Sequence, residues 1–189
     1  MIWAVILAAG ESRRMGSQKL ILPFGTNTVI EAIVKTALDS SVDETLVVLG
    51  AAEDDVRRIL KSYPVRLTVN EDYRSGMLSS VQAAFSALPL EVAAAVVMLG
   101  DQPSIPVSVI EDILKAYRQT GKGIVIPVNE GRRGHPLLVD MKHRSMVLGL
   151  DPEAGLRHLV RSHPRDVLEV EVSTPAILKD LDEPEDYAA

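Results

Sequence analysis

Short runs of Val, Ile and Leu recur along this chain, and each of the first ones is followed by a segment with helical periodicity. These runs cover residues 2–7, 45–49, 65–69, 94–99 and 124–128. Because they are apolar almost without interruption, both faces of each strand must be buried, as in a parallel sheet covered by helices. The alternation predicts an α/β fold with a mostly parallel central sheet.

The segments between these runs carry apolar residues at i, i+3, i+4 and i+7, the spacing of a half-buried helix. The helical patterns begin near Ile30, Val56, Val81, Ile110 and Leu156. Thr28 and Glu31 have the spacing of a capping box at the start of the first helix. Asp151 and Pro152 predict an N-cap and a first-turn proline for the last one.

The rhythm changes from about residue 129, where strands at 136–139 and 167–172 have less regular connections. The sequence contains no repeat, linker or low-complexity tract. We therefore expect a single domain over residues 1–189. Residues 1–128 form its βαβ part, and residues 129–189 close the site.

The net charge of −6 argues against a nucleic-acid polymer as the main partner. The chain contains no cysteine, which excludes disulfides and thiolate metal sites and is consistent with a reducing cytoplasm. The longest apolar runs, 1–9 and 92–99, are far shorter than the roughly 20 residues that span a bilayer. We expect a cytoplasmic protein with no targeting segment and no membrane association.

The first strand leads into a loop that is suited to a polyphosphate, because small residues let a backbone approach a ligand and fixed cations attract phosphate. The candidate nucleotide-binding residues of this loop are Leu7, Ala8, Ala9, Gly10, Arg14, Gly16 and Lys19. Five residues separate Gly10 from Gly16, and Lys19 stands three further on. This spacing excludes both a Walker A loop and a G-x-G-x-x-G dinucleotide motif.

A second candidate group is the sequence Gly100-Asp101-Gln102-Pro103, which follows the strand at 94–99. An unpaired carboxylate is costly to bury, so we expect Asp101 to point into a crevice at the carboxyl end of the sheet. Opposite a phosphate loop it is well placed to hold Mg²⁺. The alternative is that Asp101 begins a turn or caps the helix after Pro106.

The C-terminal segment carries five carboxylates within residues 180–186. Leu181 between Asp180 and Asp182 suggests a short extended segment against the body of the protein, in which the two carboxylates share one face. In that geometry Asp182 completes a Mg²⁺ site with Asp101. The alternative is a solvated acidic terminus.

Two further segments contain groups that could bind a ligand. Asn70 to Ser80 follows a strand and leads into a helix, so backbone N–H groups and the hydroxyls of Ser79 and Ser80 could bind a base edge or ribose. Helix capping by one serine is the alternative. Gly131 to Pro136 is expected to be a loop that receives a second anionic group or is simply solvated. The other histidines are expected at the surface or beside helices: His143, His158 and His163.

In their order and spacing these motifs resemble the MobA-like nucleotidyltransferases, and among them the molybdenum cofactor cytidylyltransferases. The resemblance covers essentially the whole chain. It rests on Leu7 to Lys19, Asn70-x-x-Tyr73-x-x-Gly76, Gly100-Asp101-x-Pro103, Gly134-His135-Pro136 and Leu181-Asp182-x-Pro184. The Ala8-Ala9-Gly10 turn is similar to that of cytidylyl members, whereas guanylyl members typically have a second glycine there.

The resemblance implies a Rossmann-like three-layer nucleotidyltransferase fold that transfers CMP from CTP, or a nucleotide from another NTP, to a molybdopterin-type acceptor. It implies Mg²⁺ as cofactor. Lys19 and Arg14 match the basic positions of the triphosphate loop, and Arg13 falls at a variable one. Asp101 matches the metal aspartate and, with Lys19 and Arg14, forms the candidate catalytic set.

The resemblance also assigns the outer parts of the site. Asp182 matches the C-terminal acidic position, and Asn70, Gly76 and Ser80 lie near the base and ribose. The loop with Arg132, Arg133 and His135 lies towards the acceptor. A transient contact with a molybdoenzyme or its chaperone is compatible with this activity. Alternatives are a related transferase that uses GTP or a sugar or small-molecule phosphate, and a non-catalytic carrier or insertion chaperone of the cofactor.

Overall fold

One sheet runs through the computed structural model, which describes residues 1–11, 18–151 and 154–181. Its strand order is β10-β7-β9-β6-β1-β4-β5, and β8 pairs with β7. The strands are β1 (Ile2–Ala8), β4 (Glu44–Leu49), β5 (Arg66–Val69), β6 (Ala94–Leu99), β7 (Ile124–Asn129), β8 (Arg132–Arg133), β9 (Leu137–Asp140) and β10 (Val167–Glu171). A separate hairpin joins β2 (Pro23–Phe24) and β3 (Asn27–Thr28). The α/β fold class with a mostly parallel sheet is confirmed.

Strand β9 is antiparallel to both of its neighbours, whereas the pairs β1–β4, β1–β6, β4–β5 and β7–β10 are parallel. It lies between β6 and β7, although it follows β7 and β8 in the sequence. A strand from the closing part of the chain is therefore inserted beside the βαβ part, and one sheet passes through both.

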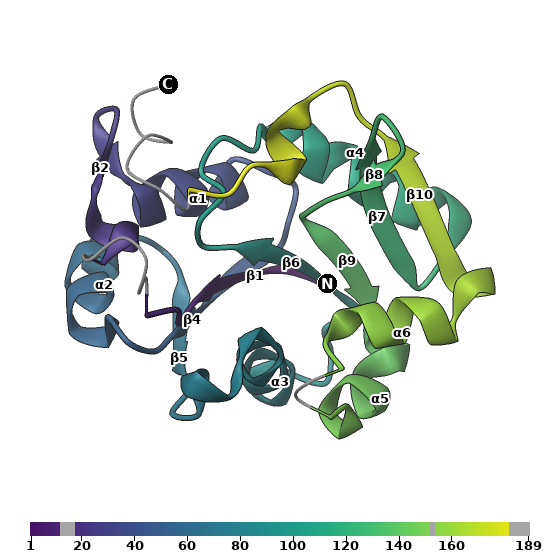
Figure 1. Ribbon diagram of the computed structural model, residues 1–189, viewed down its shortest axis with the longest axis horizontal. Helices are drawn as coiled ribbons and strands as arrows, with labels where there is room; N and C mark the ends of the chain where they lie inside the picture. The colour runs from purple at the N-terminus through teal and green to yellow at the C-terminus, as the bar shows by residue number, and fades with distance from the viewer. Residues whose placement is uncertain (12–17, 152–153, 182–189) are drawn as a thin grey trace.

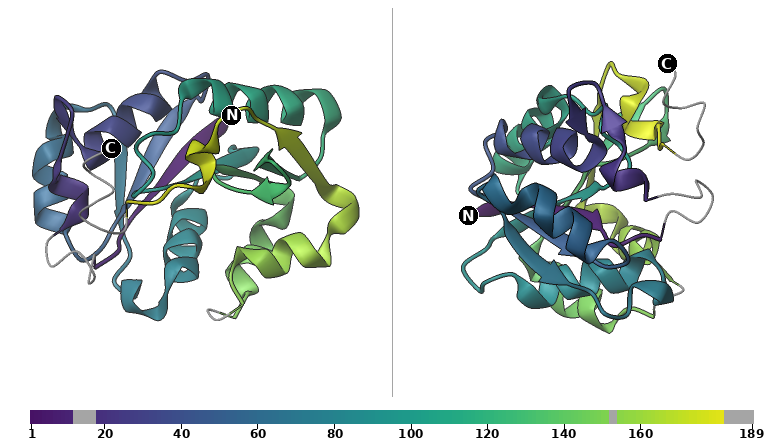
Figure 2. Two further views of the ribbon diagram at one scale, coloured as in Figure 1. Left: turned by 45° about the horizontal axis from the view of Figure 1, so that its top comes forward. Right: turned by 90° about the vertical axis from the view of Figure 1, so that its left-hand side faces the viewer.

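Helices cover both faces of the sheet, which gives the three layers visible in Figures 1 and 2. One face packs against α1 (Val29–Leu38), α2 (Glu53–Ile59) and α4 (Val107–Thr120). The other packs against α3 (Met77–Ala87), α5 (Arg144–Gly149) and α6 (Leu156–Ser162). Strand β1 shows why its run is continuously apolar, because Ile2, Ala4 and Ile6 enter the first core while Trp3 and Val5 enter the second.

Several local predictions can be compared with these elements. The capping box of Thr28 and Glu31 is confirmed at α1. Helix α6 begins at Leu156 after Gly155, so the expected N-cap at Asp151 is wrong; Gly155, with φ of 63°, redirects the chain just before the helix. Helix α5 had no expected counterpart. No helix in the described ranges is long and apolar enough to cross a bilayer.

The basic segment after β7 is a hairpin, so the expected loop is wrong there. Val128 pairs with Arg133, and Asn129 pairs with Arg132. The two residues between the strands, Glu130 and Gly131, both have positive φ angles, of 51° and 75°. Such positive angles match the twist of a two-residue hairpin turn.

A polar cluster around the buried His143 lies at the end of the sheet opposite to the loop after β1. His143 is 7% exposed, and its Nε2 lies 2.7 Å from Asp166 Oδ2. The backbone N–H of Gly123 donates to Asp166 Oδ1 at 2.9 Å, and Lys142 Nζ lies 2.9 Å from Asp166 Oδ2. His143 flanks a helix as expected, since it is the N-cap residue of α5, but the alternative of a surface position is wrong. Asp166 supplies the partner that allows the imidazole to be buried.

These donors set the acidity of Asp166. Partial burial raises the pKa of its carboxyl, but the hydrogen bonds from Gly123, Lys142 and His143 outweigh it and bring the pKa to about 2. A carboxyl whose pKa is lower in the folded than in the unfolded state stabilises the fold above the unfolded-state pKa, and this contribution is lost as pH falls.

We predict that Asp166→Asn lowers the free energy of unfolding at pH 7 by about 1–2 kcal/mol. The difference from the wild type should shrink as pH falls from about 4 towards 2, the range set by the lowered pKa of Asp166. Urea unfolding at pH 7, 4 and 3 measures it. Glu91→Gln, at an exposed position, is the control. A difference that is the same at all three pH values would contradict the role given to the charge of Asp166.

Candidate active site

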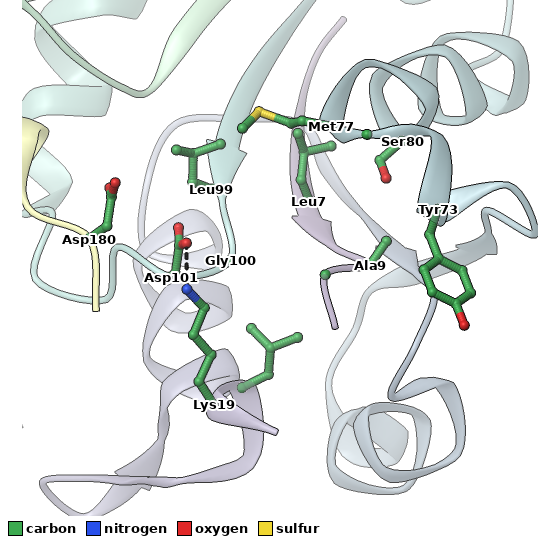
Figure 3. Close-up of a pocket in the computed structure, with 13 residues that line it drawn as sticks. Leu7, Ala9, Lys19, Tyr73, Met77, Ser80, Leu99, Gly100, Asp101 and Asp180 are labelled. Atoms are coloured by element: carbon green, nitrogen blue, oxygen red, sulfur yellow. Dashed lines mark hydrogen bonds and ion pairs between the residues drawn. The ribbon is translucent and has the colours of Figure 1, made fainter. Parts of the chain in front are cut away.

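A pocket of about 340 Å³ lies where β1 and β6 end, at the carboxyl edge of the sheet. Four segments and one residue near the C-terminal end line it: Leu7, Ala9, Gly10; Lys19, Leu20; Tyr73, Gly76, Met77, Ser80; Leu99, Gly100, Asp101; and Asp180. Figure 3 shows Lys19 and Asp101 on one side, with Asp180 beside Asp101. Parallel strands bring their carboxyl ends to one edge, so segments far apart in the sequence meet there.

Lys19 and Asp101 form an ion pair in this pocket, with 2.8 Å between Nζ and Oδ2. Only 14% and 25% of the two side chains are exposed, so water screens the pair less than it would at the surface. Lys19 Nζ also donates to the backbone oxygen of Leu181 at 3.2 Å. The ammonium group thus links the loop after β6 to the C-terminal segment.

The C-terminal segment lies along the loop that follows β6. Leu181 N donates to the backbone oxygen of Asp101 at 2.9 Å, and Gln102 Nε2 donates to Asp180 Oδ1 at 2.6 Å. Leu181 is buried in the core, which anchors the segment. These contacts bring the Asp180 and Asp101 carboxylates to the same pocket.

Gly100 and Gly10 lie at the edge of the pocket, and the structure accounts for the two glycines in different ways. A Cβ at Gly100 would lie 2.5 Å from the backbone oxygen of Leu7, so β1 and the end of β6 can approach only if residue 100 is glycine. A Cβ at Gly10 would meet no atom of the described residues within 4 Å, and Gly10 lines the pocket. Packing inside the protein explains Gly100, whereas Gly10 leaves space on the side of the pocket.

The segment that leads into α3 is organised by Asn70, which is 5% exposed. Its Nδ2 donates to Ser79 Oγ at 2.8 Å and Ser80 Oγ at 3.0 Å, and its Oδ1 accepts from Asp72 N. Asn70 is not among the residues that line the pocket, whereas Ser80 and Gly76 are. The side chain of Asn70 therefore positions the start of α3. No serine caps this helix, since Gly76 is its N-cap residue.

His135 lies beside the acidic side of the pocket. Burial lowers the pKa of its imidazole, while the nearby charges of Asp180 and Asp101 raise it. Its backbone N–H donates to Ile177 O at 3.1 Å, which ties the segment after β8 to the C-terminal one. Arg133 and Arg132 are exposed on β8, and Arg133 Nε pairs with Glu169 at 2.6 Å.

The remaining residues that the sequence predicted for the site do not line this pocket or lie outside the described residues. Ala8 is buried in the core beneath it. Arg13, Arg14, Gly16 and Asp182 lie outside the described residues. The alternative that Asp101 caps the helix after Pro106 is wrong, because Pro106 is the N-cap of α4 and no side chain caps it. Among the described ranges, no three His, Asp or Glu side chains form a metal-binding group by themselves.

Some lining residues had no signal of their own in the sequence. Leu20, Met77 and Leu99 form apolar parts of the wall, and nothing in their local pattern distinguishes a pocket residue from a core residue. Tyr73 belongs to the Asn70 to Ser80 motif and could have been chosen with it. The bond from Gln102 to Asp180 joins positions 78 residues apart, so no local pattern predicts it.

The chain matches the MobA-like NTP transferase domain over residues 4–167 and belongs to this family. The family supports an enzyme of the transferase type that takes a nucleoside triphosphate. The loop after β1, the strand that leads to Asp101 and strand β9 all fall within the matched residues.

The relatives that match almost the whole length of this chain are named for different activities. The chain is 27% identical to the molybdenum cofactor cytidylyltransferase of Escherichia coli strain K12, covering 97% of this chain and 92% of the relative. It is 30% identical to the nicotine blue oxidoreductase of Paenarthrobacter nicotinovorans, covering 96% and 92%.

Solved structures share the architecture. The Rv0371c protein of Mycobacterium tuberculosis H37Rv matches with a TM-score of 0.88 and 28% identity, over 99% of this chain and 95% of that one. A second structure of that protein, in complex with manganese, matches with a TM-score of 0.83 and 26% identity, over 99% and 95%. The three-layer nucleotidyltransferase architecture is thus shared along the whole chain.

Substitution of Gly100 and of Gly10 gives a direct test of these packing arguments. Gly100→Ala should lower Tm by about 5–10 °C, because the added methyl group collides with the Leu7 backbone and overpacks this edge. Gly10→Ala should change Tm by less than about 2 °C, because its Cβ enters open space. Thermal unfolding followed by circular dichroism measures both. Equal losses of Tm would contradict the packing difference.

Proposed function

We propose that this protein transfers CMP from CTP to the terminal phosphate of molybdopterin, which yields molybdopterin cytosine dinucleotide and pyrophosphate. One observation carries the proposal: a single pocket contains the cationic Lys19 and the carboxylates of Asp101 and Asp180 at the carboxyl edge of the sheet. Polyphosphate and its counter-cation need this combination of charges in one place.

The reaction does not require a nucleophile from the protein. An oxygen of the acceptor phosphate, already an anion at neutral pH, attacks the α-phosphorus of CTP and forms a new P–O bond. The bond from the α-phosphorus to the bridging oxygen breaks, and its electron pair leaves with pyrophosphate. The main barrier is bringing two anions together, so positioning and charge neutralisation should supply most of the rate enhancement.

The residues of the pocket fit Mg²⁺, which the family resemblance implies. Asp101 and Asp180 provide carboxylate oxygens, the ligand type that Mg²⁺ prefers, and one or two carboxylates suffice where substrate phosphates complete the coordination. Bound Mg²⁺ would stabilise charge on the phosphate oxygens. The manganese complex of the M. tuberculosis protein supports a divalent cation. Asp182 is proposed as a further ligand.

Lys19 and Asp101 neutralise each other in the protein alone. We expect nucleotide binding to give each group a new partner: the ammonium contacts a phosphate oxygen, and the carboxylate turns to the cation that accompanies it. Arg14 and the backbone of Gly10 and Gly16 are proposed to complete the phosphate contacts. Leu7, Leu99 and Met77 line an apolar part of the pocket that can cover the nucleoside.

The choice of CTP and of molybdopterin rests on similarity. The Ala8-Ala9-Gly10 turn is similar to that of cytidylyl members, and the E. coli relative is named for this reaction. Asn70, through Ser80, and Gly76 are proposed on the base and ribose side. Arg132, Arg133 and His135 are proposed on the acceptor side. A transient contact with a molybdoenzyme or its chaperone is compatible with delivery of the product.

The deciding experiment measures pyrophosphate release from CTP, GTP, ATP or UTP with molybdopterin and Mg²⁺. We expect release with CTP, and a preference of about tenfold or more over the other nucleotides. A preference for GTP would show that the protein transfers GMP and not CMP. If no nucleotide released pyrophosphate, the result would support the alternative of a non-catalytic carrier of the cofactor. Because one relative is named an oxidoreductase, oxidation of NADH and NADPH with the same acceptor is measured in parallel.

Asp101→Asn keeps the shape of the side chain and removes its charge. We predict that kcat falls by about a hundredfold or more, because the counter-cation loses a ligand and transition-state charge is less stabilised. Asp54→Asn, at an exposed position, is the control and should keep the wild-type rate. An Asp101 variant with over half the wild-type rate at saturating Mg²⁺ would contradict the metal role.

Lys19→Gln removes the ammonium group that faces the proposed phosphates. We predict a decrease of kcat/KM for CTP of about thirtyfold or more, since a charge-assisted contact to phosphate is lost. Lys61→Gln, at an exposed position, controls for the loss of one positive charge. Unchanged steady-state constants would show that Lys19 has only a structural role.

A further inference from the structure

A second hollow, of about 280 Å³, lies between α6 and the part of the sheet formed by β7, β8 and β9. Ile126, Leu137 and Val160 give it an apolar floor, and Arg133, Arg157 and Arg161 line it with positive charge. Figure 1 shows α6 beside this end of the sheet. We call it the arginine hollow. A surface that combines an apolar floor with guanidinium groups suits a flat ring that carries an anionic substituent.

A neighbouring hollow of about 480 Å³ shares Arg133, Val160 and Arg161 with the first. Among the described residues that line the two hollows, Glu169 is the one that is acidic, and Arg133 already pairs with it at 2.6 Å. In a chain with a net charge of −6, this surface therefore has a local excess of positive charge. Such an excess attracts anions over short distances.

Arg157 and Arg161 stand one turn apart on α6, at positions i and i+4. Like charges at this spacing repel each other and destabilise a helix. Within the described part of the chain, neither guanidinium has an ion pair with a carboxylate. No carboxylate of the described residues offsets this repulsion, and an anionic ligand would offset it.

The arginine hollow is next to the candidate active site but separate from it. His135 lines the hollow and also experiences the charges of Asp101 and Asp180, which line the first pocket. A molecule in the hollow could therefore extend past His135 towards the Lys19–Asp101 pair. The group that reacts there cannot at the same time contact Arg157 and Arg161, because these arginines line the hollow and not the first pocket.

We propose that Arg157 and Arg161 of α6 bind a second anionic group of the acceptor, distinct from the phosphate that reacts, while the ring of the acceptor packs on the apolar floor. This inference rests on the proposed nucleotide transfer. It defines the acceptor class as a flat heterocycle with two separated anionic groups. Arg157 and Arg161 are positioning residues, since they hold the acceptor and do not touch the reacting atoms.

The test uses the full chain with Arg157→Gln/Arg161→Gln, and with Arg165→Gln as the control at an exposed position that lines neither hollow. In the transfer assay, the double variant should raise KM for molybdopterin by about tenfold or more, with kcat and KM for CTP nearly unchanged. Because the two positions repel each other, Tm should not fall. An unchanged KM for molybdopterin would overturn the proposal.

A binding measurement separates this inference from the proposed function. Pterin-6-carboxylate is a fluorescent heterocycle with an anionic group and no phosphate, so its binding does not depend on nucleotide transfer. It should bind the wild type, the Arg165 variant and Asp101→Asn alike, and the double variant at least about tenfold more weakly. This result would stand even if no nucleotide were transferred. No binding to the wild type, or equal binding to the double variant, would overturn the inference.

Discussion

The contact between Lys19 and Asp101 organises the candidate active site, because it joins three segments that are distant in the sequence. Lys19 follows the loop after β1, Asp101 follows β6, and the backbone of Leu181 accepts from the same ammonium group. The pair is mostly buried, so neither charge would be stable there without the other. In the proposed function this pair exchanges its partners for a phosphate and a cation, which carry the same two charges.

Asp166 and Asp101 show how surroundings give one chemical group two uses. Asp166 receives a backbone N–H and the side chains of Lys142 and His143, which keep it ionised and join β7 to the segment before β10. Asp101 forms an ion pair with Lys19, and both side chains line the pocket. The first carboxylate stabilises the fold, while the second lies in the pocket where we propose that a bound phosphate becomes the partner of Lys19.

Patterns that repeat along the chain predicted the fold well. The apolar strand runs, the helical spacing and the capping box of Thr28 and Glu31 depend on neighbours within a few residues, and these are confirmed. Predictions that depended on a distant partner were less successful. His143 was expected at the surface or beside a helix, and its burial depends on a carboxylate 23 residues away. Asn70 gave no sign that its amide would donate to Ser79 and Ser80.

The sequence by itself determined the mostly parallel sheet between helices and the motifs at the strand ends, because burial on both faces and turn chemistry are local properties. Only the tertiary structure decided that β9 enters between β6 and β7, that Asp180 reaches the pocket of Asp101, and that the arginines of α6 line a hollow beside His135. Those outcomes depend on strand pairing and packing between distant segments, for which the chain carries no periodic signal.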